Sequence, residues 1–236
     1  MIKGDKTSGV YSIGFFGPSV LASFSGRDYT EDRRSEFLKD AGVSVDSLVQ
    51  LKQVHSANLV LIKANQRPSP DCQADGMLTK TPGITLGIRT ADCVPVFFWD
   101  EERKAAGIAH AGWRGIYQGI IPKMVQAMRQ NFGSEAQSIK VAFGPAIRPC
   151  CYLVGDEFSE FFPQFFISPQ AGETQGKMDL IAAVSFGLSQ EGIDEAQVFD
   201  TGFCTSCNAR DFFSARREKG TLERMLSIIQ IRPDVV

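Results

Sequence analysis

Three apolar runs follow one another closely in the middle of the sequence, over residues 84–89, 94–99 and 105–109. Each run has the length of a β-strand and is apolar along most of that length, without regular alternation of apolar and polar residues. Runs of this kind are typical of strands buried on both faces, so helices or a second sheet must cover both sides of them. The polar segment 100–104 predicts the turn between the second and third strands.

Helical patterns flank this central region. Residues 29–42 (YTEDRRSEFLKDAG) predict a helix that Thr30 caps, and residues 117–133 (YQGIIPKMVQAMRQNFG) predict a second helix, which accepts Pro122 only near its first turn. No change of composition is sharp enough to mark a linker, and no internal repeat is present. We therefore expect a layered α/β fold with a single domain over residues 1–236.

Other segments carry strand or helix patterns of their own. The C-terminal segment 225–231 (MLSIIQI) fits either an amphipathic helix or a closing strand, and its β-branched isoleucines favour the strand. The remaining expected elements are strands at 9–16, 47–54, 57–64, 140–147 and 197–199, and helices at 156–162 and 179–190.

The charges of the chain nearly cancel, with a formal net charge of −2. No overall field therefore draws the protein to nucleic acid or to an anionic membrane, and small molecules are the expected partners. The first residues lack the apolar core of a secretory signal, and no apolar run reaches membrane-spanning length. These features predict a cytoplasmic protein; its oligomeric state is left open.

The two histidines of the chain, His55 and His110, and Cys93 each stand where one predicted strand ends or another begins. Because α/β proteins place ligands at strand ends, these three side chains can converge at one end of a sheet. Two imidazoles and a thiolate suit zinc, and three protein ligands leave a fourth position open for water or substrate, as in catalytic sites. The sequence therefore indicates one catalytic zinc site.

Other interpretations of these residues stay open. Each histidine can be a hydrogen-bonded structural residue, and Cys93 can be a small buried side chain, as free cysteines often are. Blue-copper sites use the same ligand types, but they usually gather the cysteine, one histidine and the methionine in one short loop. Here 16 residues separate Cys93 from His110.

Charged residues near these ligands are candidates for supporting roles. Asp92 adjoins Cys93 and either orients a metal ligand or caps a turn. Arg114 stands where a helix begins and is the leading candidate for a phosphate or carboxylate contact, although a surface salt bridge is the alternative. Arg216, beside Arg217, is a second candidate for anion binding or else a solvated side chain.

Four more cysteines lie in the second half of the chain, as Cys150-Cys151 and as a Cys-x-x-Cys pair, Cys204 and Cys207. Such a pair alone is a weak zinc or redox signal. Adjacent cysteines do not easily share one tetrahedral ion, and the chain has no third histidine. We therefore expect structural thiols here and no second metal site.

Five separated segments together resemble the laccase-domain family, whose bacterial members are labelled polyphenol oxidase, purine nucleoside phosphorylase or peptidoglycan editing factor. The resemblance runs from about residue 48 to the C-terminus, with TADC-x-PV and HAGWRG the most specific motifs. The segments are QVHSANLV, ADGMLTKTPGITLGIRTADCVPV, IAHAGWRGIYQGI, FGPAIRPCCYLVGDEF and CTSCNARDFFSARRE.

The resemblance implies a single domain of stacked mixed β-sheets flanked by helices, with the metal held by His55, Cys93 and His110. It also implies phosphorolysis of adenosine, inosine and methylthioadenosine, with nucleoside and phosphate as partners, and adenosine deaminase activity beside it. Zinc (Zn²⁺) fits both reactions. Copper can displace zinc in vitro, because the order of divalent affinities favours it.

Two further activities are alternatives that the family labels suggest. One is removal of misincorporated serine from a peptidoglycan precursor, in which zinc can also serve. The other is copper-dependent polyphenol oxidation, which the histidine count opposes, because two histidines can build at most one mononuclear site.

The sequence departs from the family pattern in two places. The N-terminal segment FFGPSVLASFSGRDY stands where the family usually has a glycine-rich, serine-containing segment that helps to form the nucleoside pocket. Ala215 stands where the family usually has an aromatic residue. Both departures bear on the choice of substrate, and the second predicts a wider pocket.

Overall fold

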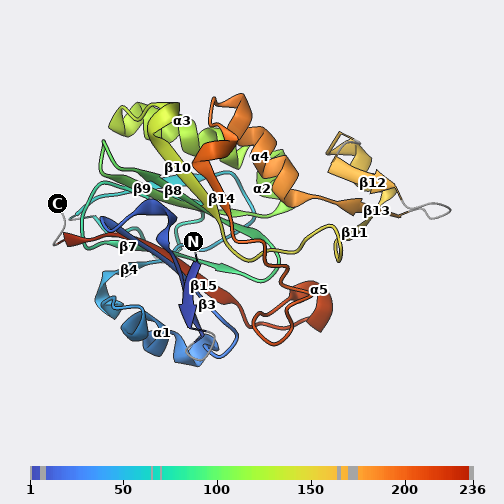
Figure 1. Cartoon of the computed structure of the whole chain (residues 1–236), viewed down its shortest axis with the longest axis horizontal. Coiled ribbons are helices and arrows are strands. Elements are labelled where there is room, and N and C mark those ends of the chain that lie inside the picture. The colour runs from blue at the N-terminus through green and yellow to red at the C-terminus, as the bar shows by residue number, and fades with distance from the viewer. Residues whose placement is uncertain are drawn as a thin grey trace.

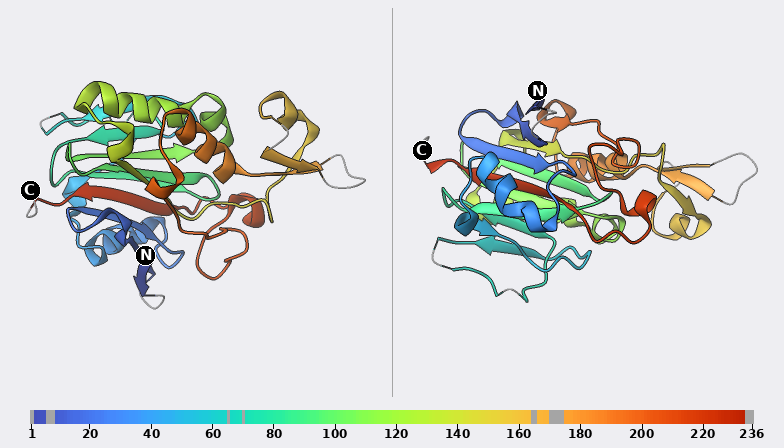
Figure 2. Two further views of the ribbon diagram at one scale, coloured as in Figure 1. Left: turned by 45° about the horizontal axis from the view of Figure 1, so that its top comes forward. Right: turned by 90° about the horizontal axis from the view of Figure 1, so that it is seen from below.

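Two six-stranded β-sheets lie face to face, with helices on their outer sides (Figures 1 and 2). The layers run from α1 through the first sheet and the second sheet to α3 and α4. The coordinates are a computed structural model, which describes residues 2–5, 9–64, 66–69, 71–163, 166–169 and 175–233.

The first sheet is antiparallel except at one edge, where β4 pairs parallel to β7. Its strands in spatial order are β1 (Ile2–Asp5), β2 (Val10–Ile13), β3 (Val20–Ser25), β15 (Met225–Ile231), β7 (Thr85–Thr90) and β4 (Leu48–Val49). The C-terminal isoleucine-rich segment thus forms a central strand, which confirms the strand prediction for residues 225–231.

The second sheet is also mixed, with parallel pairs at both edges and antiparallel pairs between them. Its strands in spatial order are β14 (Val198–Asp200), β10 (Ile139–Phe143), β8 (Val94–Asp100), β9 (Ala105–Ala111), β6 (Gly76–Thr79) and β5 (Leu59–Ile62). A small third sheet extends to one side (Figure 1) and contains β11 (Leu153–Gly155), β13 (Gln175–Met178) and β12 (Ile167–Pro169).

Strand β8 shows why the central apolar runs do not alternate with polar residues. Phe97 and Trp99 point into the core between the two sheets, whereas Val96 and Phe98 belong to the core under the helices. All four are fully buried. Successive side chains of a strand face opposite ways, so a strand between two apolar layers must be apolar throughout. The prediction of burial on both faces is confirmed.

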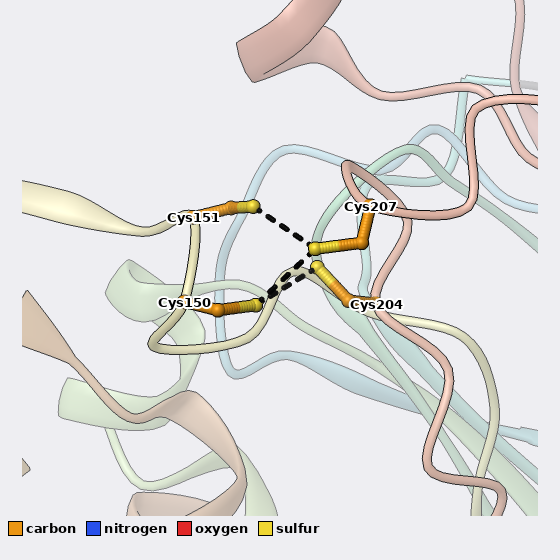
Figure 3. Close-up of side chains that lie close together, drawn as sticks. All are labelled: Cys150, Cys151, Cys204 and Cys207. Carbon is orange, nitrogen blue, oxygen red and sulfur yellow. Dashed lines mark hydrogen bonds between the residues drawn. The ribbon is translucent and has the colours of Figure 1, made fainter.

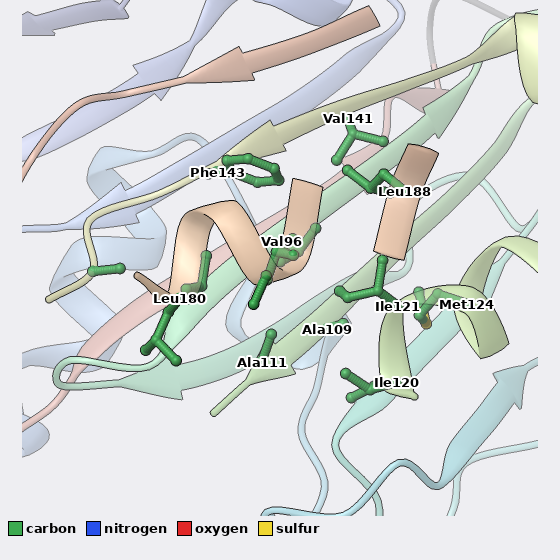
Figure 4. Packing of buried hydrophobic residues seen from close by; sticks show 14 of the residues in the cluster. Val96, Ala109, Ala111, Ile120, Ile121, Met124, Val141, Phe143, Leu180 and Leu188 are labelled. Carbon is green, nitrogen blue, oxygen red and sulfur yellow. The ribbon is translucent and has the colours of Figure 1, made fainter. Parts of the chain in front are cut away.

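Helices α3 (Ile120–Phe132) and α4 (Leu180–Gln190) cover the outer face of the second sheet, as Figure 4 shows. Met124 and Leu188 pack there against strand residues such as Val141. Burying a side chain of this size contributes about 1.5–3 kcal/mol. On the opposite side of the molecule, α1 (Arg34–Asp40) buries Phe37 against the first sheet.

The structure corrects several predicted boundaries near the N-terminus. The helix expected at 29–42 is a 3-10 turn at Glu31–Arg33 followed by α1. Thr30 does not cap it, since its side chain accepts no backbone N–H of the turn; its hydroxyl donates to the Asp32 carboxylate at 2.6 Å. The strand expected at 47–54 contains only the two residues of β4.

Glycine and proline account for two other differences. The helix expected at 117–133 begins only at Ile120, as α3, and the short helix α2 (Trp113–Tyr117) precedes it, because Gly119 adopts a left-handed conformation with φ 81° between them. The helix expected at 156–162 is a 3-10 helix over Asp156–Glu160, and Pro163 disfavours helical geometry at the residue before it. A short helix, α5 (Ala215–Glu218), precedes β15. In the part of the chain that the structure describes, no helix combines the length and the hydropathy needed to cross a bilayer.

Candidate metal centre

His55, Cys93 and His110 meet where several strands of the second sheet begin or end, and the ligand atoms that they offer lie within 4.8 Å of one another. Cys93 directly precedes β8, and His110 is the penultimate residue of the antiparallel strand β9, opposite Pro95. His55 lies in the segment before β5, which runs parallel to β6 and so begins at the end of the sheet where β9 ends. The sheet pairing therefore brings together residues that are far apart in sequence.

Gly112 leaves room for the three ligands to approach. A Cβ atom at this position would lie 2.9 Å from Sγ of Cys93 and 3.1 Å from Cδ2 of His55. The first distance is shorter than real contacts of a Cβ atom. The glycine of the HAGWRG motif is thus needed for space, since its φ of −81° is open to any residue.

Asp75 is a buried carboxylate that the sequence analysis missed. Its Oδ1 atom lies 2.8 Å from Nδ1 of His110 and accepts the backbone N–H of His55 at 3.0 Å. Its Oδ2 atom accepts the N–H and the hydroxyl of Ser56 and the N–H of Val54. Because Nδ1 of His110 donates to this carboxylate, Nε2 remains for a metal ion.

The protonation of these groups is strongly coupled. Burial tends to raise the pKa of Cys93, but the charge of His110 and hydrogen bonds from both histidines lower it to about 6. Burial tends to lower the pKa of His110, but Cys93 and Asp75 raise it to about 9. For Asp75 too, burial opposes the shift, and hydrogen bonds from His110 and Ser56 lower its pKa to about 2. The thiolate that a metal needs is therefore available at neutral pH.

The donor set fits a divalent metal of the zinc type. One buried imidazole nitrogen, one thiolate and one exposed imidazole of His55 face the same point. The two histidine rings are 4.8 Å apart between centroids and inclined by 69°, so they do not stack on each other. Two nitrogen donors and one sulfur donor suit zinc with one coordination position open.

Two of the four non-glycine residues with positive φ in the described part of the chain lie at the candidate metal centre. His55 has φ 60° and Asp92 has φ 95°, values that side chains other than glycine rarely adopt. Such strain costs of order 1–3 kcal/mol per residue and persists where the surrounding contacts enforce it. Here the hydrogen bonds to Asp75 hold the strained backbone of His55, and the contacts of the Asp92 side chain hold the strained backbone beside Cys93.

Asp92 connects the Cys93 loop to the C-terminal part of the chain. Its Oδ1 accepts the hydroxyl of Thr205 at 2.6 Å, and its Oδ2 accepts the backbone N–H of Arg216 at 2.7 Å. Neither bond goes to a histidine. The carboxylate that contacts His110 is Asp75, whereas Asp92, for which the sequence left open either orienting a metal ligand or capping a turn, does not contact a histidine.

A pocket of about 920 Å³ opens over the three ligands. Its walls include Trp113, Tyr152, Ala215 and Arg216, and the guanidinium of Arg216 lies 4.9 Å from the centre of the Tyr152 ring. Arg114 does not line this pocket; it is exposed and lies over the Trp113 ring at 4.4 Å. Of the two arginines expected to hold an anion, the structure places Arg216 in the pocket.

Comparison with known proteins agrees with this architecture. Residues 25–232 match the family described as multi-copper polyphenol oxidoreductase laccase. Purine nucleoside phosphorylase YlmD from Geobacillus stearothermophilus is 31% identical over 94% of this chain and 87% of its own length. The solved structure of that YlmD superposes with a TM-score of 0.88, at 27% identity over 97% of this chain and 98% of the other.

Two other relatives have different lengths and names. Human purine nucleoside phosphorylase LACC1 is 32% identical over 81% of this chain, which spans only 45% of that protein. Adenosine deaminase RL5, from an unknown prokaryotic organism, is 32% identical over 79% of this chain and 76% of its own length. Because the family match extends over most of the sequence and the fold is shared, the chain belongs to the multi-copper polyphenol oxidoreductase laccase family.

Proposed function

We propose that this chain is a zinc-dependent purine nucleoside phosphorylase that accepts adenosine, inosine and methylthioadenosine, with adenosine deaminase activity at the same site. The observation that carries the proposal is the convergence of His55, Cys93 and His110 beneath a pocket that Arg216 lines. The names of the relatives YlmD, LACC1 and RL5 support both activities.

In phosphorolysis, a phosphate oxygen bonds to C1′ of the ribose while the bond from C1′ to the purine breaks, and the base leaves with a proton. In deamination, water replaces the amino group of adenosine and ammonia leaves. When bound, zinc supplies a Lewis acid beside the reacting groups. The pocket must supply the rest: a cation for the phosphate and apolar walls for the purine.

The residues of the pocket suit these tasks. Arg216 offers a guanidinium, which binds phosphate through paired hydrogen bonds, and the Arg114 guanidinium is the second candidate outside the pocket wall. Trp113 and Tyr152 offer flat apolar surfaces against which a purine ring can stack. Ala215 leaves space beside them. Asp75 holds His110 through Nδ1 and keeps its Nε2 directed at the metal position.

The direct test is product analysis with zinc-loaded protein. Inosine should give hypoxanthine and ribose 1-phosphate only when phosphate is present. Adenosine should give adenine when phosphate is present, and it should give inosine and ammonia when phosphate is absent. Cys93→Ala, which removes one metal ligand, is the inactive control. If neither base nor ammonia is released at high enzyme concentration by protein shown to contain zinc, the proposal is wrong.

A further inference from the structure

Cys150, Cys151, Cys204 and Cys207 form a second cluster of possible metal ligands, away from the three described above. All four sulfur atoms lie within 4.8 Å of one another. Figure 3 shows the two pairs pointing toward each other from two separate loops, one before β11 and one between β14 and α5. Residues about fifty positions apart in the sequence thus meet at one point.

Three of the distances between the sulfurs come close to the edges of a tetrahedron around one ion, and all four sulfurs lie within 4.8 Å of one another. Sγ of Cys150 lies 3.6 Å from that of Cys204 and 3.5 Å from that of Cys207, and Sγ of Cys151 lies 3.4 Å from that of Cys207. Bonds of about 2.3 Å from zinc to four thiolates place the sulfurs about 3.8 Å apart. A disulfide needs about 2.05 Å. Four sulfurs this close enclose a single ion and leave no room for a multi-iron cluster.

The local backbone explains how two adjacent cysteines can reach the same ion, contrary to the expectation from the sequence. The N–H groups of Cys151 and Tyr152 both donate to the carbonyl of Arg148, so a tight turn presents both sulfurs on one side. In the other loop, the N–H of Asn208 donates to the carbonyl of Cys204, which closes the Cys-x-x-Cys turn. The sequence predicted structural thiols without a metal because adjacent cysteines do not easily share one ion. The structure removes that geometric objection.

The surroundings also suit a bound cation. Backbone groups of Cys207, Arg148 and Ser206 face the sulfur of Cys204 and orient it, as partners behind a metal ligand do. Cys150 and Cys207 are nevertheless exposed, so a solvated ion can reach the cluster.

We propose that these four cysteines bind one structural zinc ion, independent of the ion held by His55, Cys93 and His110. Four thiolates arranged as a tetrahedron favour zinc among the common divalent ions, and a site closed by four protein ligands is structural. Binding releases the thiol protons to solvent and involves no oxidation. The inference does not depend on the nucleoside activity proposed above.

The ion would join two walls of the substrate pocket. Cys151 is followed by Tyr152, which lines the pocket, and Cys204 is followed by Thr205, which donates to Asp92 beside Cys93. Crosslinking these two loops fixes Tyr152 relative to Arg216, whose guanidinium lies over its ring. The second zinc ion thereby shapes the pocket without touching a substrate.

Counting metal in purified full-length protein tests this proposal. Elemental analysis should find two zinc ions per chain in the unaltered protein, because it has two ligand clusters. Cys207→Ser and Cys93→Ser should each lose one ion, and the combined variant should lose both. Cys72→Ser, which alters a half-buried thiol outside both clusters, should lose none. Unchanged zinc in Cys207→Ser, or iron lost there in place of zinc, overturns the proposal.

A second measurement avoids variants that fail to fold. The unaltered protein is alkylated under native conditions and the labelled cysteines are mapped by mass spectrometry. The exposed thiols of Cys150 and Cys207 should be protected until a strong zinc chelator is added. Rapid labelling without the chelator overturns the proposal. Protection that is removed by a reductant but not by a chelator also overturns it, because such protection indicates disulfides.

Discussion

The buried carboxylate of Asp75 and the Nδ1 atom of His110 lie 2.8 Å apart, and the same carboxylate accepts the backbone N–H of His55. One residue thus positions two of the three candidate metal ligands. It fixes the ring of His110 directly and holds the strained loop of His55 through its main chain. A metal ligand positioned by a buried carboxylate binds more strongly, because its ring orientation and tautomer are set in advance.

Asp75→Asn is expected to weaken zinc binding by about 10–100-fold, the range typical of lost partners behind metal ligands. An asparagine has one acceptor oxygen in place of two, so it cannot serve both His110 and the loop at Val54–Ser56. Competition with a chromogenic chelator measures the affinity. Asp71→Asn, at an exposed carboxylate of the same segment, is the control and should bind zinc normally. Equal affinities in the two variants would contradict this role for Asp75.

Gly112→Ala is expected to reduce zinc affinity by at least about 10-fold while the protein remains folded. The added Cβ would meet Cys93 and His55, and two of the three ligands would have to shift. Gly107→Ala is the matched control, since Gly107 lies in β9 and its Cβ would lie 2.8 Å from the flexible end of Met124 in α3. That variant should lower the melting temperature and leave zinc affinity unchanged. If Gly112→Ala bound zinc as tightly as Gly107→Ala, the site would have more space than the structure indicates.

Arg216→Ala is expected to raise the KM for phosphate by about 10–100-fold, the equivalent of losing one charged hydrogen bond of about 1.5–3 kcal/mol. Arg114→Ala should change that KM by less than about threefold, because Arg114 lies outside the pocket wall over Trp113. Initial rates with varied phosphate at saturating inosine measure the difference. The reverse order of effects would restore Arg114 as the phosphate contact.

The sequence predicted those parts of the molecule that depend on local pattern and on which side chains can bind metal. Residues 94–99 were recognised as a strand buried on both faces because no polar residue interrupts them. The sequence offers His55 and His110 as candidate ligands because the chain has no other histidine, and Cys93 because it stands between two predicted strands; the structure brings the three together.

The sequence does not predict contacts that depend on the register between strands or on the rotation of side chains around a helix. Asp75 directly precedes Gly76, and an Asp-Gly pair ordinarily indicates a turn. Only the pairing of Gly76 with Ala109 places this carboxylate beside His110. Arg114 was placed correctly at the start of a helix, but helical rotation turns its side chain onto Trp113 and away from the pocket.

Asp92→Asn is expected to change the shape of the substrate pocket and to leave metal binding unchanged. The amide nitrogen cannot accept the backbone N–H of Arg216, while the amide oxygen can still accept the hydroxyl of Thr205. Asparagine also tolerates positive φ better than most residues, so the strained backbone at this position is retained. We expect KM for nucleoside and phosphate to rise and zinc affinity to stay within about twofold of the unaltered protein, the opposite of Asp75→Asn.

Thr205→Val provides the matched comparison, because it removes the other bond of Asp92 at a buried position without changing the size of the side chain. It leaves an Asp92 oxygen unpaired, which costs about 1–3 kcal/mol of stability. If Asp92 joins the Cys93 loop to both partners, the two substitutions share one contact network, and their effects on thermal unfolding should not be additive in the double variant. Strictly additive effects would show that the two bonds of Asp92 act independently, and a loss of zinc in Asp92→Asn as large as in Asp75→Asn would show that Asp92 acts on the metal ligand.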